Sequence, residues 1–138
     1  MTVCFNDIKV GDAIPPLVKP PLDRVRIAMF AGASGDFNPI HIDDQAAHAN
    51  NLPGVIAHGM LSMAFLGQLL TGWAPRRALR GFSTRFTAMA FPGDIITCRG
   101  VVKAKFEENG EKLVELELSA VNQRGEQTLA GQARIALP

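Results

Sequence analysis

The sequence has few cysteines, little net charge and no long apolar run, and each shortage excludes a class of protein. Only two cysteines occur among the 138 residues, Cys4 and Cys98, and they lie far apart in the chain. They cannot form a disulfide framework or a metal-ligand cluster, and they suit a reducing compartment. The formal net charge of +1 gives no electrostatic reason to expect nucleic acid or a membrane surface as a partner.

Hydrophobic segments typical of secreted or membrane proteins are also missing. No basic stretch followed by an apolar one opens the sequence, so we expect no signal peptide. The longest apolar run, residues 60–70, contains Ser62 and Gln68 and is too short to cross a bilayer. No repeat, low-complexity segment or linker divides the chain, and 47% of its residues are hydrophobic. We therefore expect one domain over residues 1–138, located in the cytoplasm.

Two helices are expected before a strand-rich C-terminal third. Proline pairs keep the first twenty residues extended, with at most a short strand. Asp23 is placed to cap a helix that carries Val25, Ile27 and Phe30. Residues 58–73 predict a second helix that is apolar on nearly every side, which is typical of a buried helix.

Alternating polar and apolar residues predict strands over 94–106, 112–121 and the last ten residues. A two-residue turn at Asn109-Gly110 would set apolar residues of one strand opposite polar residues of the next. We therefore predict a three-residue loop, 108–110, with Gly110 in the left-handed region and Lys103 opposite Glu115. One long buried helix followed by antiparallel strands indicates an α+β fold, with a single sheet wrapped around one helix.

The segment from 30 to 47 contains the chain's best candidate for chemistry, because it places Asp36 and His41 five residues apart. On a continuous helix these side chains would diverge, and Pro39 interrupts a helix here in any case. They can meet only if the segment folds as an ordered turn. A carboxylate beside an imidazole is a usual pair for acid–base catalysis near neutral pH. The alternative is an ordinary Asp-x-Asn-Pro turn with a surface histidine.

This segment resembles the signature of the MaoC-like hydratase/dehydratase family, which includes the (R)-specific enoyl-CoA hydratases. The resemblance rests on Gly-Asp-Phe-Asn-Pro-Ile-His at 35–41 and Ile-Ala-His-Gly-Met at 56–60, and it extends to 85–86, 92–94 and the C-terminal strands. It implies a hotdog fold and a substrate that is an acyl chain on coenzyme A or on acyl carrier protein. It also implies a homodimer, or a heterodimer with a related subunit, in which sheet edges pair.

The resemblance also implies roles for individual residues. His41 is expected as the base that deprotonates water and Asp36 as the proton donor, although the two roles could be reversed or shared. The backbone N–H of Gly59, at the start of the buried helix, is the expected oxyanion donor. No cofactor and no metal are expected.

Contacts to substrate are expected from four further residues, namely Ser34, Asn38, Met60 and Ser62. Asn38 is expected mainly to hold the turn between Asp36 and His41.

Neighbouring polar residues are given structural roles. His58 is expected to orient the turn, and Asp43 and Asp44 to be solvated residues in the first turn of a short helix.

Two other functions remain open. A hotdog thioesterase would use a carboxylate to activate water against the thioester carbonyl. A non-catalytic role, as an acyl-CoA-binding regulator or as one half of a heterodimeric dehydratase, is the other. Acyl length, the physiological direction and the basic residues that would bind the phosphates of coenzyme A stay undetermined.

Overall fold

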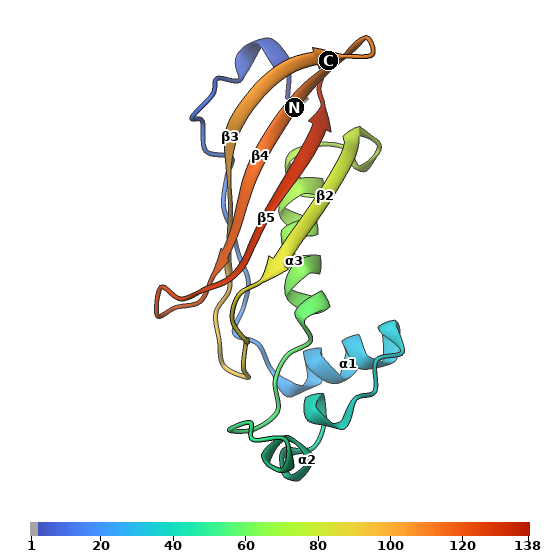
Figure 1. Ribbon diagram of the computed structural model, residues 1–138, viewed down its shortest axis with the longest axis vertical. Helices are drawn as coiled ribbons and strands as arrows, with labels where there is room; N and C mark the ends of the chain where they lie inside the picture. The colour runs from blue at the N-terminus through green and yellow to red at the C-terminus, as the bar shows by residue number, and fades with distance from the viewer. Residues whose placement is uncertain (1–2) are drawn as a thin grey trace.

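A five-stranded antiparallel sheet wraps around one long helix in the computed structural model, which describes residues 3–138 (Figure 1). The sheet order is β1-β3-β4-β5-β2. Its strands are β1 (Leu17–Val18), β2 (Leu79–Phe86), β3 (Thr97–Glu108), β4 (Glu111–Val121) and β5 (Gln127–Ala136). The central helix is α3 (Gly59–Trp73); the others are α1 (Arg24–Ser34), α2 (Asp44–Ala49) and the short 3-10 turns Phe5–Asp7, Pro39–His41 and Arg76–Ala78. This arrangement confirms the predicted α+β fold.

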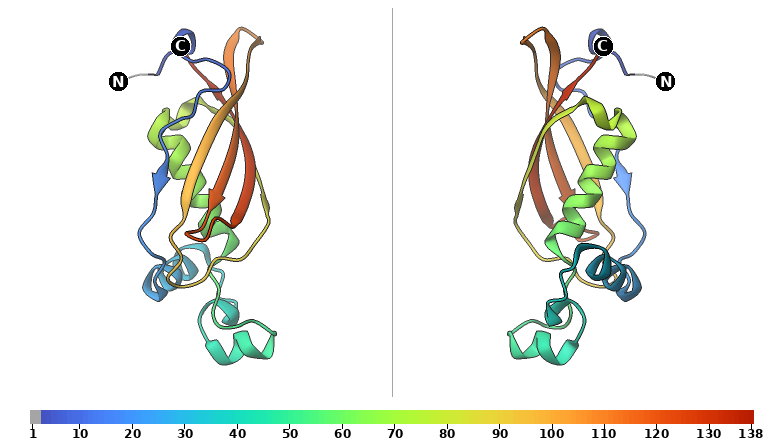
Figure 2. Two further views of the ribbon diagram at one scale, coloured as in Figure 1. Left: turned by 90° about the vertical axis from the view of Figure 1, so that its left-hand side faces the viewer. Right: turned by 90° about the vertical axis from the view of Figure 1, so that its right-hand side faces the viewer.

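Helix α3 lies on the concave face of the sheet, and the side views show the strands curving around it (Figure 2). Its buried side chains include Phe65, Leu66 and Leu70, which pack in one core with sheet residues such as Leu116 and Ile135. Burying each of these large side chains contributes about 1.5–3 kcal/mol. The predicted buried helix is therefore confirmed, beginning one residue later than expected. Within residues 3–138 no helix is both long and apolar enough to cross a membrane.

The hairpin between β3 and β4 is tighter than the predicted loop. Glu108 pairs directly with Glu111, and Asn109 and Gly110 both have positive φ, 51° and 77°, as a two-residue type I′ turn requires. The predicted three-residue loop is therefore wrong. The apolar residues of β3 and β4 come to lie on the same face of the sheet further from the turn, because the pairing shifts by one residue between Val102 and Ala104.

This bulge changes the partner of Lys103. Ala104 takes the predicted place opposite Glu115, and the amine of Lys103 pairs instead with Glu117 at 2.9 Å. Beyond the bulge Lys105 shares the inner face, where its amine donates to the backbone carbonyls of Phe5 and Ile8.

Strand β2 was not anticipated from the sequence. Among the strands that the structure describes it pairs only with β5, and it forms one edge of the sheet. The pairing depends on Gly131, since a Cβ there would lie 2.6 Å from the backbone oxygen of Ser83.

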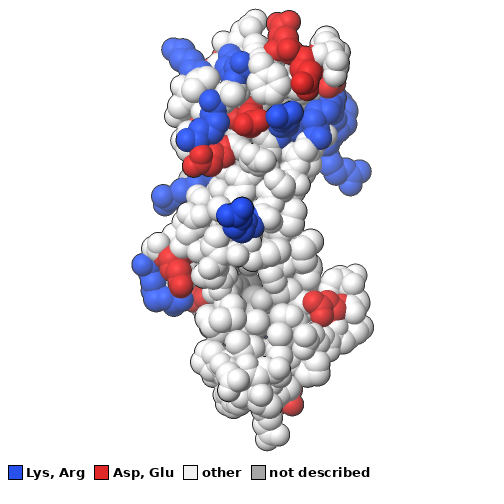
Figure 3. Space-filling model, in the orientation of Figure 1, with Lys and Arg blue, Asp and Glu red and all other residues white. Residues whose placement is uncertain are grey.

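Mixed charges cover the outer face of the sheet and the end of the sheet that is away from α1 and α2 (Figure 3). Few charges are visible over α1 and α2 in this view.

Helices α1 and α2 and the turn between them extend beyond the end of the sheet, next to the start of α3 (Figures 1 and 2). Asp23 caps α1 as predicted, by accepting the N–H of Arg26 at 2.6 Å. Asp44 is not simply solvated as predicted: its carboxylate accepts two hydrogen bonds from Arg24, at 2.8 and 3.0 Å, and the N–H of Val55 at 3.0 Å. Asp44 thus ties α2 to α1 and to the chain that leads into α3.

Candidate active site

The turn after α1 folds Asp36 toward His41. Gly35 ends the helix in the left-handed conformation, with φ of 74°. The N–H of Asp36 then donates to Ser34 Oγ, and the Asp36 carboxylate accepts the N–H of Asn38, each at 3.2 Å. As a result, His41 Nε2 lies 3.8 Å from Asp36 Oδ2. The two residues meet across an ordered turn, as the sequence predicts.

His41 is fixed in one tautomer by its backbone partner. Its Nδ1 lies 2.7 Å from the carbonyl oxygen of Ile56. A carbonyl only accepts, so the proton is on Nδ1 and Nε2 keeps its lone pair. The His41 side chain is 8% exposed and that of Asp36 is 52% exposed. The pair therefore consists of a sheltered imidazole and a carboxylate open to solvent.

His58 supports both members of the pair. Its Nε2 donates to the backbone oxygen of Asp36 at 3.0 Å, and its ring stacks on His41 with centroids 3.8 Å apart. The Phe30 ring packs against the His58 ring in a T-shaped contact, with centroids 4.9 Å apart. His58 is buried, and its Nδ1 has no partner among the described residues. These contacts are those of a residue that orients the turn.

A cavity of about 390 Å³ opens beside His41. The remainder of its lining is mostly apolar and comes from three segments, namely Ile56, Ala57, Gly59 and Ser62; Phe86 to Ala90; and Leu129. Of the residues expected at the site, this lining contains His41, Gly59 and Ser62.

The other expected site residues lie outside this lining. Asp36 does not line the cavity itself, but it lies 3.8 Å from His41, which does. Ser34 and Asn38 serve the turn, since their side chains accept the N–H groups of Asp36 and Ile40. Met60 is 56% exposed and points away from the core.

Gly59 begins α3 at the wall of the cavity, so its N–H belongs to the first turn and has no partner within the helix. The space that a side chain would take at Gly59 is already occupied. A Cβ there would lie 2.8 Å from the ring of Phe86. The missing side chain thus makes room for Phe86, which itself lines the cavity.

Asp36, His41 and His58 also lie close enough to be considered as metal ligands, with ligand atoms within 4.8 Å of one another. However, the two imidazoles are stacked at an interplanar angle of 25°, so their in-plane lone pairs do not converge on one point. One nitrogen of each ring is also engaged with a carbonyl. The geometry favours proton transfer over ion binding.

A second cavity, of about 770 Å³, is lined by residues 53–55 and 91–94 together with charged and polar side chains that include Arg24, Asp44 and Arg124. Asp94 in its lining is buried, and its carboxylate accepts the N–H of Phe91, Gln123 Nε2 and one Arg124 nitrogen. Burial opposes ionisation, but the hydrogen bonds from Gln123, Phe91 and Arg124 outweigh it and hold the pKa of Asp94 below its ordinary value.

Asp44 lies in the same cavity with its pKa also lowered, mainly by the N–H of Val55 and by Arg24. From the sequence, Asp44 was expected to be a solvated residue, and no role was assigned to Asp94 or to the Ile56 carbonyl; the Pro-Gly-Asp at 92–94 was the available signal for Asp94.

The fold defines the class: a hotdog domain, in which Asp36 and His41 lie paired near the start of the central helix. The sequence model of the MaoC-like domain family matches residues 9–123 of the chain. The chain belongs to this family.

Named relatives agree with this assignment. The chain is 32% identical over 138 residues to an (R)-specific enoyl-CoA hydratase of Rhodospirillum rubrum, covering 97% of this chain and 91% of that one. It is 33% identical to the fatty acid synthase subunit beta of Saccharomyces cerevisiae over 134 residues, which are 95% of this chain and 6% of that protein. It likewise spans only 3% of fatty acid synthase 2 of Mycosarcoma maydis, at 35% identity over 79% of this chain.

Among solved structures, the (R)-hydratase of A. caviae superposes with a TM-score of 0.82 and 29% identity, covering 95% of this chain and 98% of the other.

Proposed function

We propose that the protein catalyses the reversible hydration of a 2-enoyl thioester to a (R)-3-hydroxyacyl thioester, carried on coenzyme A or on acyl carrier protein. The observation that carries the proposal is the 2.7 Å contact of His41 Nδ1 with the Ile56 carbonyl, which favours a proton on Nδ1 and leaves Nε2, 3.8 Å from Asp36, as the base. This separation is too long for a direct hydrogen bond but allows one water about 2.8 Å from both atoms. The (R)-specific enoyl-CoA hydratases of Rhodospirillum rubrum and Aeromonas caviae, each 32% identical to this chain, support the reaction type.

The steps follow from the two side chains. His41 Nε2 removes a proton from the water as its oxygen bonds to the β-carbon. The C=C π electrons move toward the α-carbon and the thioester oxygen, and the Gly59 N–H stabilises the charge on that oxygen. The proton then passes from His41 to the Asp36 carboxylate, and Asp36 delivers it to the α-carbon, which restores the starting state of both residues.

The test is the loss of conjugated enoyl-thioester absorbance with crotonyl-CoA and a medium-chain analogue. Asp36→Asn and His41→Ala should each lower kcat by about 10²–10⁴-fold, since each removes a positioned acid or base. His48→Gln is the matched control, because His48 lies on α2 with its ring at the Pro53 carbonyl, outside the catalytic cavity, and should keep its activity.

Two results would contradict the proposal. Release of free thiol without hydration would indicate a thioesterase. Wild-type activity in both variants would show that Asp36 and His41 take no part in catalysis. Chiral analysis of the hydroxyacyl product tests the (R) assignment.

We also propose that two copies of the chain associate through the edge of β2. Within the described residues, 3–138, this strand is paired on one side only. Phe86 and Met89, which line the cavity, are 52% and 46% exposed, and Met60, which follows Gly59 in the chain, is 56% exposed. A partner on this edge would cover them and enclose the cavity. A heterodimer with a related subunit is the alternative.

We further propose that the protein is located in the cytoplasm, which fits the free, buried thiol of Cys98.

A further inference from the structure

A chain of hydrogen bonds leaves His41 on the side away from Asp36. His41 Nδ1 donates to the carbonyl of Ile56 at 2.7 Å. That carbonyl belongs to the peptide that joins Ile56 to Ala57, and the N–H of the same peptide donates to the carbonyl of Ala90 at 2.8 Å. One peptide unit therefore accepts from the histidine and donates to the opposite wall of the cavity.

The next peptide continues the chain in the same direction. The carbonyl of Ala90 shares its peptide with the N–H of Phe91, and this N–H donates to Asp94 Oδ2 at 2.9 Å. The series thus runs from His41 through two peptide units and ends on a carboxylate that is 3% exposed. Every donor in it points away from His41 and toward Asp94.

Asp94 is held firmly at the end of this series. Its second oxygen, Oδ1, accepts from Gln123 Nε2 at 2.9 Å and from Arg124 at 3.1 Å, both in the turn between β4 and β5. These bonds orient the carboxylate so that Oδ2 faces Phe91. A buried carboxylate is a stronger acceptor than a neutral group, and hydrogen bonds in series polarise one another by roughly 10–30% per bond.

We propose that Asp94 is a positioning residue for His41, which acts through the peptides Ala90–Phe91 and Ile56–Ala57. Its negative charge polarises both peptides and makes the Ile56 carbonyl a better acceptor. That carbonyl in turn holds the proton on Nδ1 and leaves Nε2 as the base. A carboxylate in direct contact with a catalytic imidazole fixes its tautomer in the same way. The catalytic consequence rests on the proposed function, whereas the effect on the tautomer does not.

A purely structural role for Asp94 makes different predictions. Asp94 also closes a turn, because its own N–H donates to the Phe91 carbonyl at 3.0 Å. If that were its whole contribution, its loss would lower stability without altering the protonation pattern of His41. The deciding readout is therefore the ¹⁵N shifts of the His41 ring, which distinguish protonated from unprotonated nitrogen in the absence of substrate.

The experiment compares wild type, Asp94→Asn and Asp44→Asn by ¹⁵N NMR and by hydration kinetics. Asp44 is the matched control: it too accepts a backbone N–H and pairs with an arginine beside the same cavity, but it lies outside the series. Asp94→Asn should shift His41 from one tautomer toward a mixture. It should lower kcat about tenfold with KM within twofold, a smaller loss than the about 10²–10⁴-fold expected for losing the base itself. Asp44→Asn should leave the tautomer unchanged.

A second variant covers the case in which Asp94→Asn does not fold. Replacing Phe91 by its α-hydroxy analogue, phenyllactate, removes one N–H and keeps both the carboxylate and the aromatic ring. The same tautomer shift should follow. An unchanged His41 tautomer in a folded variant, or an equal shift in Asp44→Asn, would overturn the proposal. If wild type lacks hydratase activity, the proposed function fails while the tautomer comparison still decides the role of Asp94.

Discussion

At the scale of single residues, Gly59 shows how an absent side chain can serve two purposes. It begins α3, where its N–H has no helical partner and is the proposed oxyanion donor, and it leaves room for the Phe86 ring that lines the cavity. Gly59→Ala would place a methyl group 2.8 Å from that ring, so the ring has to move. Because Phe86 is half exposed and can rotate outward, we expect activity to fall at least tenfold while the free energy of unfolding changes by less than about 1 kcal/mol.

Gly67 offers a matched control within the same helix. A Cβ there would meet Phe82 at 3.7 Å, an ordinary contact. Gly67→Ala should therefore gain about 0.5–1 kcal/mol of stability from helix propensity and keep full activity. Enzyme assays and urea unfolding of both variants are the measurements. Full activity in Gly59→Ala would show that neither the ring position nor close approach at Gly59 matters.

At the scale of secondary-structure elements, the contact between β2 and β5 depends on close backbone approach. Gly131→Ala should cost about 1–3 kcal/mol, because its Cβ would lie 2.6 Å from the backbone oxygen of Ser83, which cannot rotate away. Gly81→Ala, on the same pair of strands, meets no atom within 4 Å and should change stability by less than about 0.5 kcal/mol. Equal urea midpoints for the two variants would contradict this explanation.

The same strands mark how far sequence patterns can predict the fold. Helix α3 and strands β4 and β5 were predictable, because continuous apolar surface or strict alternation fixes which side is buried. The β3–β4 loop was predicted wrongly, because the argument assumed unbroken alternation between the turn and the middle of the strands. The bulge beside Lys103 places apolar residues of the two strands on the same face without a longer loop, and no residue type is diagnostic of such a bulge. Strand β2 was missed because its residues alternate too weakly.

At the scale of the whole molecule, the proposed dimer predicts a mass near twice the 14.8 kDa of one chain. Sedimentation equilibrium measures this directly. Phe86→Glu should weaken association, because it places a charge among exposed apolar groups at the proposed interface. Val101→Glu is the control, since Val101 is also exposed but lies on β3, away from the β2 edge. A wild-type monomer, or equal weakening by both variants, would contradict association through β2.

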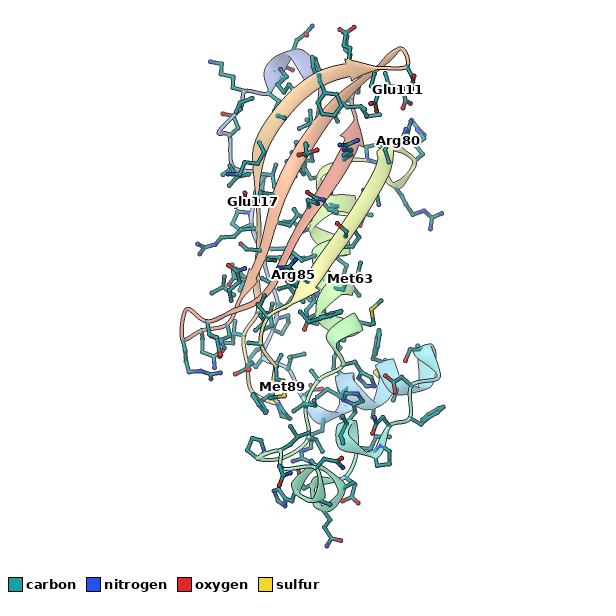
Figure 4. The ribbon with its side chains drawn as sticks, viewed as in Figure 1. Met63, Arg80, Arg85, Met89, Glu111 and Glu117 are labelled. Carbon is teal, nitrogen blue, oxygen red and sulfur yellow. The ribbon has the colours of Figure 1, made fainter. Side chains whose placement is uncertain are left out.

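The whole molecule also explains which parts of the site were open to prediction. Asp36 and His41 are close in sequence, and the proline between them limits how they can meet. Ser34 and Met60 were expected at the substrate, but side-chain direction depends on where the turn and α3 are anchored. The partners of Asp94 come from 91 and from 123–124, which only the folded sheet brings together. Arg80 and Glu111 form an ion pair, as Arg124 and Asp94 do, but they lie at the end of the sheet away from the candidate site (Figure 4).

The series between Asp94 and His41 has a consequence for mutagenesis. Its intermediate links are main-chain groups of Ile56, Ala57, Ala90 and Phe91, and these remain whatever side chains the residues carry. Side-chain substitutions at these positions, two of which are already alanine, therefore report on local packing and cannot detect the connection. Only proline or a backbone ester at 57 or 91, which removes an N–H, interrupts it. A catalogue of side-chain variants would leave Asp94 as an isolated sensitive position with no visible link to the histidine.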